Sequence, residues 1–162
     1  MHRLRSTLAR QRAELEVAES DGSVPPVARL LSDLREALDL LENVESAALG
    51  VVRVLVVDDD ERLGELTARS LRRLGFDAEA ADRLRALRAG EVVVFDLGVS
   101  ASLTSADRAV LRAARPVVVT GAVDSASRAL AADLGASDYL VKPVDSEELA
   151  AAINRRMTEE RP

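Results

Sequence analysis

The sequence Val54-Leu55-Val56-Val57-Asp58-Asp59-Asp60 is an apolar run of strand length that stops abruptly at three carboxylates. Apolar runs of similar length recur further along the chain, over residues 92–95, 117–119 and 139–141. A fifth run, residues 76–80, alternates Phe or Ala with Asp or Glu, which is typical of a half-exposed edge strand. Continuous apolar runs indicate strands that are buried on both faces. We therefore expect a sheet of five strands after Gly50.

Segments with helical periodicity separate these runs. Apolar residues lie three or four positions apart in Leu63, Leu66, Leu71 and Leu74, and again in Leu149, Ile153 and Met157. Strands that alternate with helices predict a parallel sheet with helices on both of its faces. The expected fold class is therefore α/β, and Asp60 is expected to be the N-cap of the helix that begins near Glu61.

The composition excludes several classes of function. The chain of 162 residues has no cysteine, and its single histidine is His2, so disulfides, thiol catalysis and histidine metal sites are excluded. A net charge of −6 argues against a nucleic-acid or anionic-membrane surface. No stretch approaches the length of a membrane span, and the N-terminus has no signal-peptide core. We expect a soluble cytoplasmic protein that binds neither nucleic acid nor membrane.

Residues 1–49 differ from the rest of the chain and are predicted to form a helical extension. Breakers at Asp21-Gly22-Ser23 and Pro25-Pro26 divide this region into two helical stretches, which predicts a hairpin or a short helix followed by a long one. The second stretch carries an apolar stripe at Val27, Leu31, Leu34, Leu38 and Leu41. This stripe either folds back on residues 50–158 or pairs with a second chain, and a homodimer through residues 1–46 is one expectation.

The polar residues that end the strands carry the chemistry. The first run ends in Asp58-Asp59, and later runs end in Asp96, Thr120 and Lys142. The carboxyl ends of parallel strands share one edge of the sheet, so these side chains are expected to converge there. Two carboxylates about 4 Å apart repel by about 4 kcal/mol at an effective dielectric near 20. An oxygen-only cluster of this kind favours a hard divalent cation, Mg²⁺ or Mn²⁺.

Such a cation and a lysine would make one of the carboxylates a competent nucleophile for a phosphoryl group, because both neutralise charge on the transferring oxygens. The Thr120 hydroxyl could then donate to the acyl phosphate, which adds a charge of about −1.5 to −2.

The chain from Val54 to Met157 resembles the receiver domain of two-component response regulators. The matching segments are the opening Val54–Asp60 run, then Val94-Phe95-Asp96-Leu97, Val117-Val118-Val119-Thr120-Gly121 and Leu134-Gly135-Ala136-Ser137-Asp138-Tyr139-Leu140-Val141-Lys142-Pro143. The resemblance covers about two thirds of the chain. It implies a flavodoxin-like, doubly wound, five-stranded parallel sheet with strand order 2-1-3-4-5, preceded here by an N-terminal helical hairpin.

The resemblance also assigns roles at the acidic pocket. Asp96 would accept the phosphoryl group. Asp59 and Asp96 would ligate Mg²⁺ directly, together with the backbone carbonyl of Gly98, and Asp58 would act through a water.

Beyond the acidic residues, Thr120 and Tyr139 would form the switch pair, and Lys142 would be the phosphate-binding cation. Lys142-Pro143 resembles the cis peptide of the family. Two segments depart from the pattern. The one between Gly75 and Asp96 is short, which predicts a second helix of only one or two turns. The one after Asp96 has Val99 and Ser100 where the family has Met-Pro.

These features predict a two-component, phosphorelay-type signalling protein that is not a turnover enzyme. Asp96 would take a phosphoryl group from a histidine kinase or phosphotransfer protein. Only residues 158–162 follow Met157, so output is expected through an unknown downstream protein rather than through a DNA-binding domain. The alternative is a pseudo-receiver, a binding or adaptor module that ignores phosphate and acts through its N-terminal helices. The domains are expected at residues 1–49 and 50–158.

Overall fold

The computed structural model describes residues 50–159 without a break and, before them, residues 9, 12–13, 15–17, 20, 28–35 and 37–38. The chain divides into two units, Met1–Gly50 and Val51–Pro162. Every described residue between Ala9 and Leu38 is helical. The breakers that predict a hairpin lie outside the described residues, so the hairpin, like the roles of the two predicted domains, stays a prediction.

The first unit differs from the sequence pattern in what it buries. Leu31, Leu34 and Leu38 of the predicted apolar stripe are 47%, 50% and 50% exposed. Asp33 and Ala37, on other sides of the same helical stretch, are buried. The stripe is therefore a half-exposed apolar face within the described residues.

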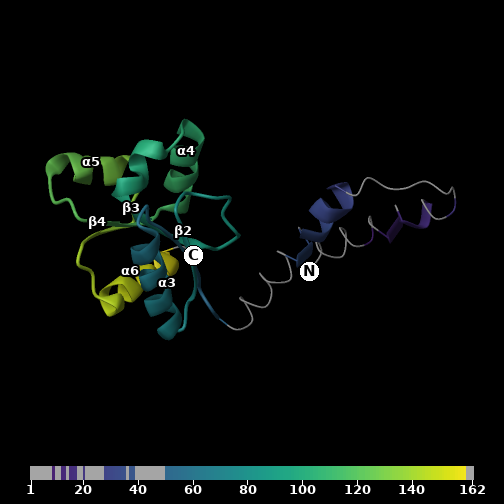
Figure 1. The fold of residues 1–162 in the computed structure, drawn as a ribbon, viewed down its shortest axis with the longest axis horizontal. Helices are drawn as coiled ribbons and strands as arrows, with labels where there is room; N and C mark the ends of the chain where they lie inside the picture. Colours follow the sequence, from purple (N-terminus) through teal and green to yellow (C-terminus); the bar gives the residue numbers. More distant parts are fainter. Residues whose placement is uncertain are drawn as a thin grey trace. The chain divides into compact units, whose positions relative to one another are not determined.

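The second unit is built on a five-stranded, wholly parallel sheet (Figure 1). Its strands are β1 (Arg53–Val57), β2 (Asp77–Ala81), β3 (Val92–Asp96), β4 (Val117–Thr120) and β5 (Asp138–Val141). Their order in the sheet is β2-β1-β3-β4-β5, as the family resemblance implies, and the alternating run lies on an edge as β2. Both predictions are confirmed.

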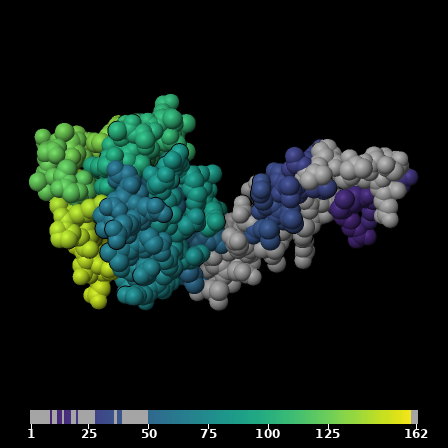
Figure 2. All heavy atoms as spheres, in the orientation of Figure 1, coloured from purple at the N-terminus to yellow at the C-terminus, as the bar shows by residue number. Residues whose placement is uncertain are grey.

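Helices cover both faces of the sheet. The helix α3 (Glu61–Arg73) and the helix α6 (Ser146–Glu159) lie side by side on one face, as Figure 1 and Figure 2 both show. Side chains on this face, such as Val54, Leu71 and Ile153, pack into one core cluster. The opposite face packs Leu55 and Phe95 in a second cluster, with residues of α4 (Ser105–Ala114) and α5 (Ser125–Asp133). The sheet is the middle layer of three.

The predicted second helix is wrong. Residues 82–91, between β2 and β3, contain no helix. The connection returns about 16 Å along the strand direction and about 10 Å sideways, because β2 and β3 flank β1. About ten residues in an α-helix would rise only about 15 Å. A segment that was helical throughout would therefore fall short, so part of it must be extended.

Ion pairs and two leucines hold this extended connection. Arg85 donates to both carboxylate oxygens of Glu91 at 2.9 and 2.8 Å and to Glu79 at 3.0 Å. Glu91 is buried and also accepts from the Arg88 backbone N–H at 3.0 Å. Leu84 and Leu87 pack against the core cluster that contains Leu55 and Phe95. Side-chain contacts thus replace the backbone hydrogen bonds that a helix would have supplied.

The segment after Asp96 is a short 3₁₀-helix, Leu97–Ser102, followed by the capped start of α4 at Thr104. Leu97 and Val99 of this turn are buried in the core. Across the described parts of the chain, no helix combines the length and the apolar character that crossing a membrane requires.

Candidate functional site

Three aspartates meet at the carboxyl edge of the sheet. Asp58 follows β1 and Asp96 ends β3, and the parallel register of Val57 with Phe95 makes the two neighbours. Each of Asp58, Asp59 and Asp96 offers a carboxylate oxygen within 4.8 Å of the others. Asp60 is the N-cap of α3, as predicted, and accepts from the backbone of Arg62 and Leu63. This cap turns the chain away from the sheet immediately after the acidic pair.

Asp58 is the most constrained member of the cluster. It is 5% exposed; its Oδ1 accepts the backbone N–H of Asp60 at 3.0 Å, and its Oδ2 accepts from Lys142 Nζ at 2.9 Å. Its own backbone N–H donates to the Ala81 carbonyl at 3.1 Å. The carboxylate is therefore fixed from both oxygens, whereas Asp59 is exposed.

Lys142 joins the cluster from β5. Its Nζ lies 2.9 Å from Asp58 Oδ2 and 3.2 Å from Asp96 Oδ2. Partial burial opposes its charge, but the hydrogen bond to Asp58 and the charge of Asp96 outweigh this and raise the pKa of Lys142 above its ordinary value. The Lys142–Pro143 peptide is cis, and the Lys142 backbone N–H donates to the Thr120 carbonyl at 2.8 Å. The lysine is therefore charged and faces Asp96.

Gly98 lies against the same carboxylates. A Cβ at this position would come within 3.0 Å of Asp59 Oδ1 and 3.0 Å of Asp96 Oδ2. The absence of a side chain thus leaves open the space between the two carboxylates. Whether the Gly98 carbonyl also ligates a cation stays a prediction.

The donor set fits a hard divalent cation. It consists of three carboxylates with oxygens close together, and Lys142 supplies one positive charge against their three negative charges. The Gly98 cradle leaves room between Asp59 and Asp96. Oxygen ligands with an unbalanced negative charge suit Mg²⁺, Mn²⁺ or Ca²⁺. The site is therefore compatible with divalent-metal binding.

The predicted switch residues lie beside this cluster and share a partner. The Thr120 side chain is buried, and its Oγ1 accepts the Ala122 backbone N–H at 3.1 Å. The Tyr139 hydroxyl donates to the Ala122 carbonyl at 2.6 Å. Thr120 and Tyr139 are thus connected through the peptide groups of Ala122. This connection has no sequence signature, because it uses only backbone atoms of an alanine.

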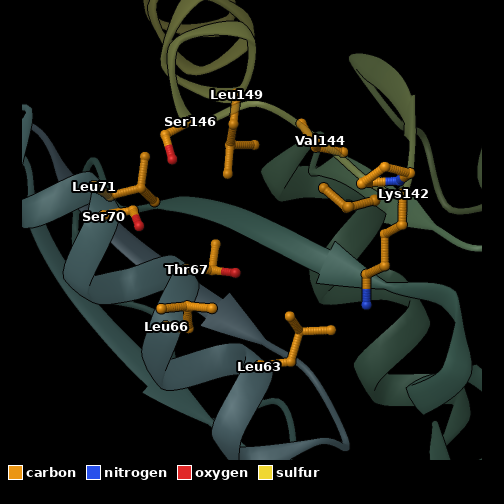
Figure 3. A pocket seen from close by; sticks show the side chains of 11 residues that line it. Leu63, Leu66, Thr67, Ser70, Leu71, Lys142, Val144, Ser146 and Leu149 are labelled. Carbon is orange, nitrogen blue, oxygen red and sulfur yellow. The ribbon is translucent and has the colours of Figure 1, made fainter.

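A groove opens between α3 and α6 next to the lysine. It has a volume of about 430 Å³, and its walls are mainly apolar. Figure 3 shows Leu63 and Leu66 of α3 on one side and Val144 and Leu149 on the other, with Lys142 at one end. Sequence analysis did not find this groove. Leu63 and Leu66, which the sequence showed only as apolar residues at helical spacing, line its α3 side, and Leu66 is 57% exposed.

The chain is similar in sequence and in fold to known response regulators. No family model matches the chain. It is 35% identical over 120 residues to the photosynthetic apparatus regulatory protein RegA of Rhodobacter capsulatus, which covers 67% of this chain and 65% of RegA. The chain spans between about half and two thirds of the length of the curated relatives it matches.

Solved structures of response regulators are similar to this chain in fold. A response regulator receiver domain protein from Clostridium thermocellum superposes with a TM-score of 0.57 at 24% identity, over 68% of this chain and 98% of that one. A response regulator from Burkholderia pseudomallei, solved with a phosphorylated aspartic acid, a calcium ion and citrate, gives a TM-score of 0.54 at 26% identity, over 67% of this chain and 69% of that one. Residues 51–159 of this chain therefore share the fold and the sequence pattern of the response regulator receiver domains of two-component systems.

Proposed function

We propose that Asp96 accepts a phosphoryl group from the phosphohistidine of a histidine kinase or phosphotransfer protein in the cytoplasm. One observation carries this proposal: Asp96 shares its pocket with two more carboxylates and with Lys142, whose Nζ is 3.2 Å from Asp96 Oδ2. A phosphohistidine carries the anionic group that such a lysine and a divalent cation would neutralise.

The transfer is a substitution at phosphorus. A carboxylate oxygen of Asp96 attacks, the P–N bond to the histidine breaks, and its electron pair leaves with the imidazole nitrogen. Asp58, Asp59 and Asp96 would hold Mg²⁺, which supplies charge neutralisation on the phosphoryl oxygens when bound. Lys142 neutralises the same charge from the β5 side. The product is a phosphorylated signalling state, so the protein is modified once per signal and is not a turnover enzyme.

The groove beside Lys142 is the surface that we assign to the phosphodonor. Its apolar walls come from two helices, Leu63 and Leu66 of α3 and Leu149 of α6 (Figure 3). A helix of the donor seated there would lie next to the lysine that contacts Asp96. Leu66→Glu is expected to slow transfer from a phosphodonor protein without changing phosphorylation by a small acyl phosphate. Equal slowing with both donors would contradict this assignment.

The half-exposed face of Leu31, Leu34 and Leu38 supports a second part of the proposal, in which residues 1–49 join two copies or dock the downstream protein. Apolar side chains at this spacing are the pattern by which helices pair. Replacing the three leucines by Gln should lower the mass of the full chain in sedimentation or abolish partner binding. An unchanged mass together with unchanged binding would refute this role.

Phosphorylation itself is tested by intact mass. The full chain is incubated with acetyl phosphate and Mg²⁺, and one phosphoryl group should add to the wild type and not to Asp96→Asn. Asp77→Asn, exposed at the start of β2 and so at the opposite edge of the sheet, is the matched control and should be phosphorylated like the wild type. No adduct at any Mg²⁺ concentration would favour the alternative, a pseudo-receiver that binds partners without phosphate.

A further inference from the structure

Tyr139 is linked to the acceptor edge on one side and to a surface arginine on the other. On the inner side, its hydroxyl is 2.6 Å from the Ala122 carbonyl, and the Ala122 N–H is 3.1 Å from Thr120 Oγ1. On the outer side, the guanidinium carbon of Arg128 lies 5.3 Å from the centre of the tyrosine ring. The order of contacts is therefore Thr120, Ala122, Tyr139, Arg128.

Arg128 lies at the protein surface and covers the ring of Tyr139. It is exposed on α5, whose N-cap Asp124 accepts the Ser127 backbone N–H at 2.8 Å. The cap follows Ala122 by two residues, so the helix that carries Arg128 continues from the loop that holds the tyrosine hydroxyl. A cation over an aromatic face is attracted by the negative ring quadrupole, which favours the ring position that it covers.

We propose that Arg128 is a positioning residue that holds Tyr139 in the conformer bonded to Ala122. This inference rests on the proposed function only for its signalling consequence. When Thr120 shifts toward a phosphoryl group on Asp96, Ala122 moves with the hydroxyl that its N–H contacts. The hydrogen bond from the Tyr139 hydroxyl to the Ala122 carbonyl then changes. The contact between Arg128 and the tyrosine ring changes with it at the protein surface.

The same contacts give the coupling a required symmetry. If the state of Asp96 changes the position of Tyr139, then a change that releases Tyr139 must in turn alter the equilibrium constant for phosphorylation of Asp96. Arg128 therefore sets how far the unphosphorylated protein already resembles the signalling state.

The chain offers an unusually direct probe. Tyr139 is its only tyrosine and it has no tryptophan, so tyrosine fluorescence reports this one side chain in the full chain. In the unphosphorylated protein, Arg128→Gln is expected to raise the acrylamide quenching constant of Tyr139 about two- to fivefold. This is the factor by which the loss of an exposed cation–ring contact would shift the equilibrium between the covered and the released tyrosine. Arg128→Lys keeps the charge and should retain part of the protection.

Arg69→Gln is the matched control, since Arg69 is an exposed arginine of α3 on the opposite face of the sheet. It should leave Tyr139 quenching unchanged. Equal quenching in wild type and Arg128→Gln would overturn the positioning role.

Acetyl phosphate and Mg²⁺ should change Tyr139 quenching in the wild type and much less in Arg128→Gln. The same change in both proteins would overturn the coupling to the switch. If the wild type takes up no phosphoryl group by mass, the proposed function fails, while the comparison of unphosphorylated proteins still decides the role of Arg128.

Discussion

The connections that precede and follow β2 are made in different ways. The first, from β1 to β2, contains the capped helix α3, and every signal for it stands in the sequence: Asp60 as N-cap, leucines at helical spacing and Gly75 after the end. The second, from β2 to β3, contains no helix and is held by Arg85, Glu91 and two leucines. Local sequence thus determines one connection, whereas the other depends on contacts between residues that meet only in the folded state.

The difference matters because the ion pairs that hold the second connection lie away from the acidic edge of the sheet. Asp58 and Asp59 sit between β1 and the N-cap of α3, and Asp96 ends β3. Glu91 lies at the other end of β3, next to Val92, so its ion pair with Arg85 is a full strand length from Asp96. Changes in the ion pair of Arg85 with Glu91 should therefore alter stability without altering the acidic site.

The largest expected effect comes from Glu91→Gln. This change leaves the partly buried Arg85 without its main carboxylate partner, and the free energy of unfolding should fall by about 2–3 kcal/mol. Denaturant titration of the full chain measures the loss. Glu79→Gln is the control, because Glu79 is half exposed in the same ion-pair group and should cost less than about 1 kcal/mol. Equal losses from the two variants would contradict the assigned role of the buried carboxylate.

The contribution of Glu91 should also depend on pH. Burial opposes its ionisation, but hydrogen bonds from Arg85 and the Arg88 backbone outweigh burial and lower its pKa below 4.5. A lowered folded-state pKa means that the unfolded chain binds the proton more readily, so stability rises with pH through this range. The stability difference between wild type and Glu91→Gln should be full above pH 4.5 and shrink as pH falls through the lowered pKa. A difference that stays constant as the pH falls through this range would refute the assignment.

Gly98→Ala tests the acidic edge itself. The new Cβ would stand 3.0 Å from both Asp59 Oδ1 and Asp96 Oδ2, so the two carboxylates would have to shift away from the space between them. We expect Mg²⁺ affinity, measured by calorimetric titration, to fall about tenfold or more, with little change in the denaturation midpoint. Gly121→Ala is the matched control, since a Cβ there meets nothing within 4 Å. Equal Mg²⁺ affinity in both variants would show that the space beside Gly98 is not the cation site.

The parts of the molecule that the sequence predicted are those with local signals. Apolar runs located the strands, and the residues that end these runs located Asp58, Asp96 and Lys142, because parallel strands share a carboxyl edge. The missing second helix was mispredicted from family resemblance, because the ion pairs of Arg85 and the packing of Leu84 and Leu87 that hold the connection leave no periodic pattern in the sequence. The bridge through Ala122 and the cover of Arg128 over Tyr139 could not be predicted, because backbone acceptors and surface rotamers leave no pattern in the sequence.

The smallest expected effect concerns the lifetime of the phosphoryl group. By family resemblance, Gly98 and Ala122 flank the acceptor, and neither has the bulk to keep water from an acyl phosphate. Gly98 is a poor place to add shielding because its Cβ would crowd the carboxylates. Ala122→Arg keeps the backbone bonds to Thr120 and Tyr139 and adds only a side chain.

Hydrolysis of phosphorylated Ala122→Arg should slow about two- to threefold, since about 0.5 kcal/mol added to the barrier corresponds to this factor. The decay of the phosphorylated full chain, followed by intact mass after removal of the donor, measures it. Val123→Arg makes the same charge change one residue along, at a side chain that is 65% exposed, and should leave the decay unchanged. Equal decay in both variants and the wild type would mean that water reaches the acceptor by a route that position 122 does not guard.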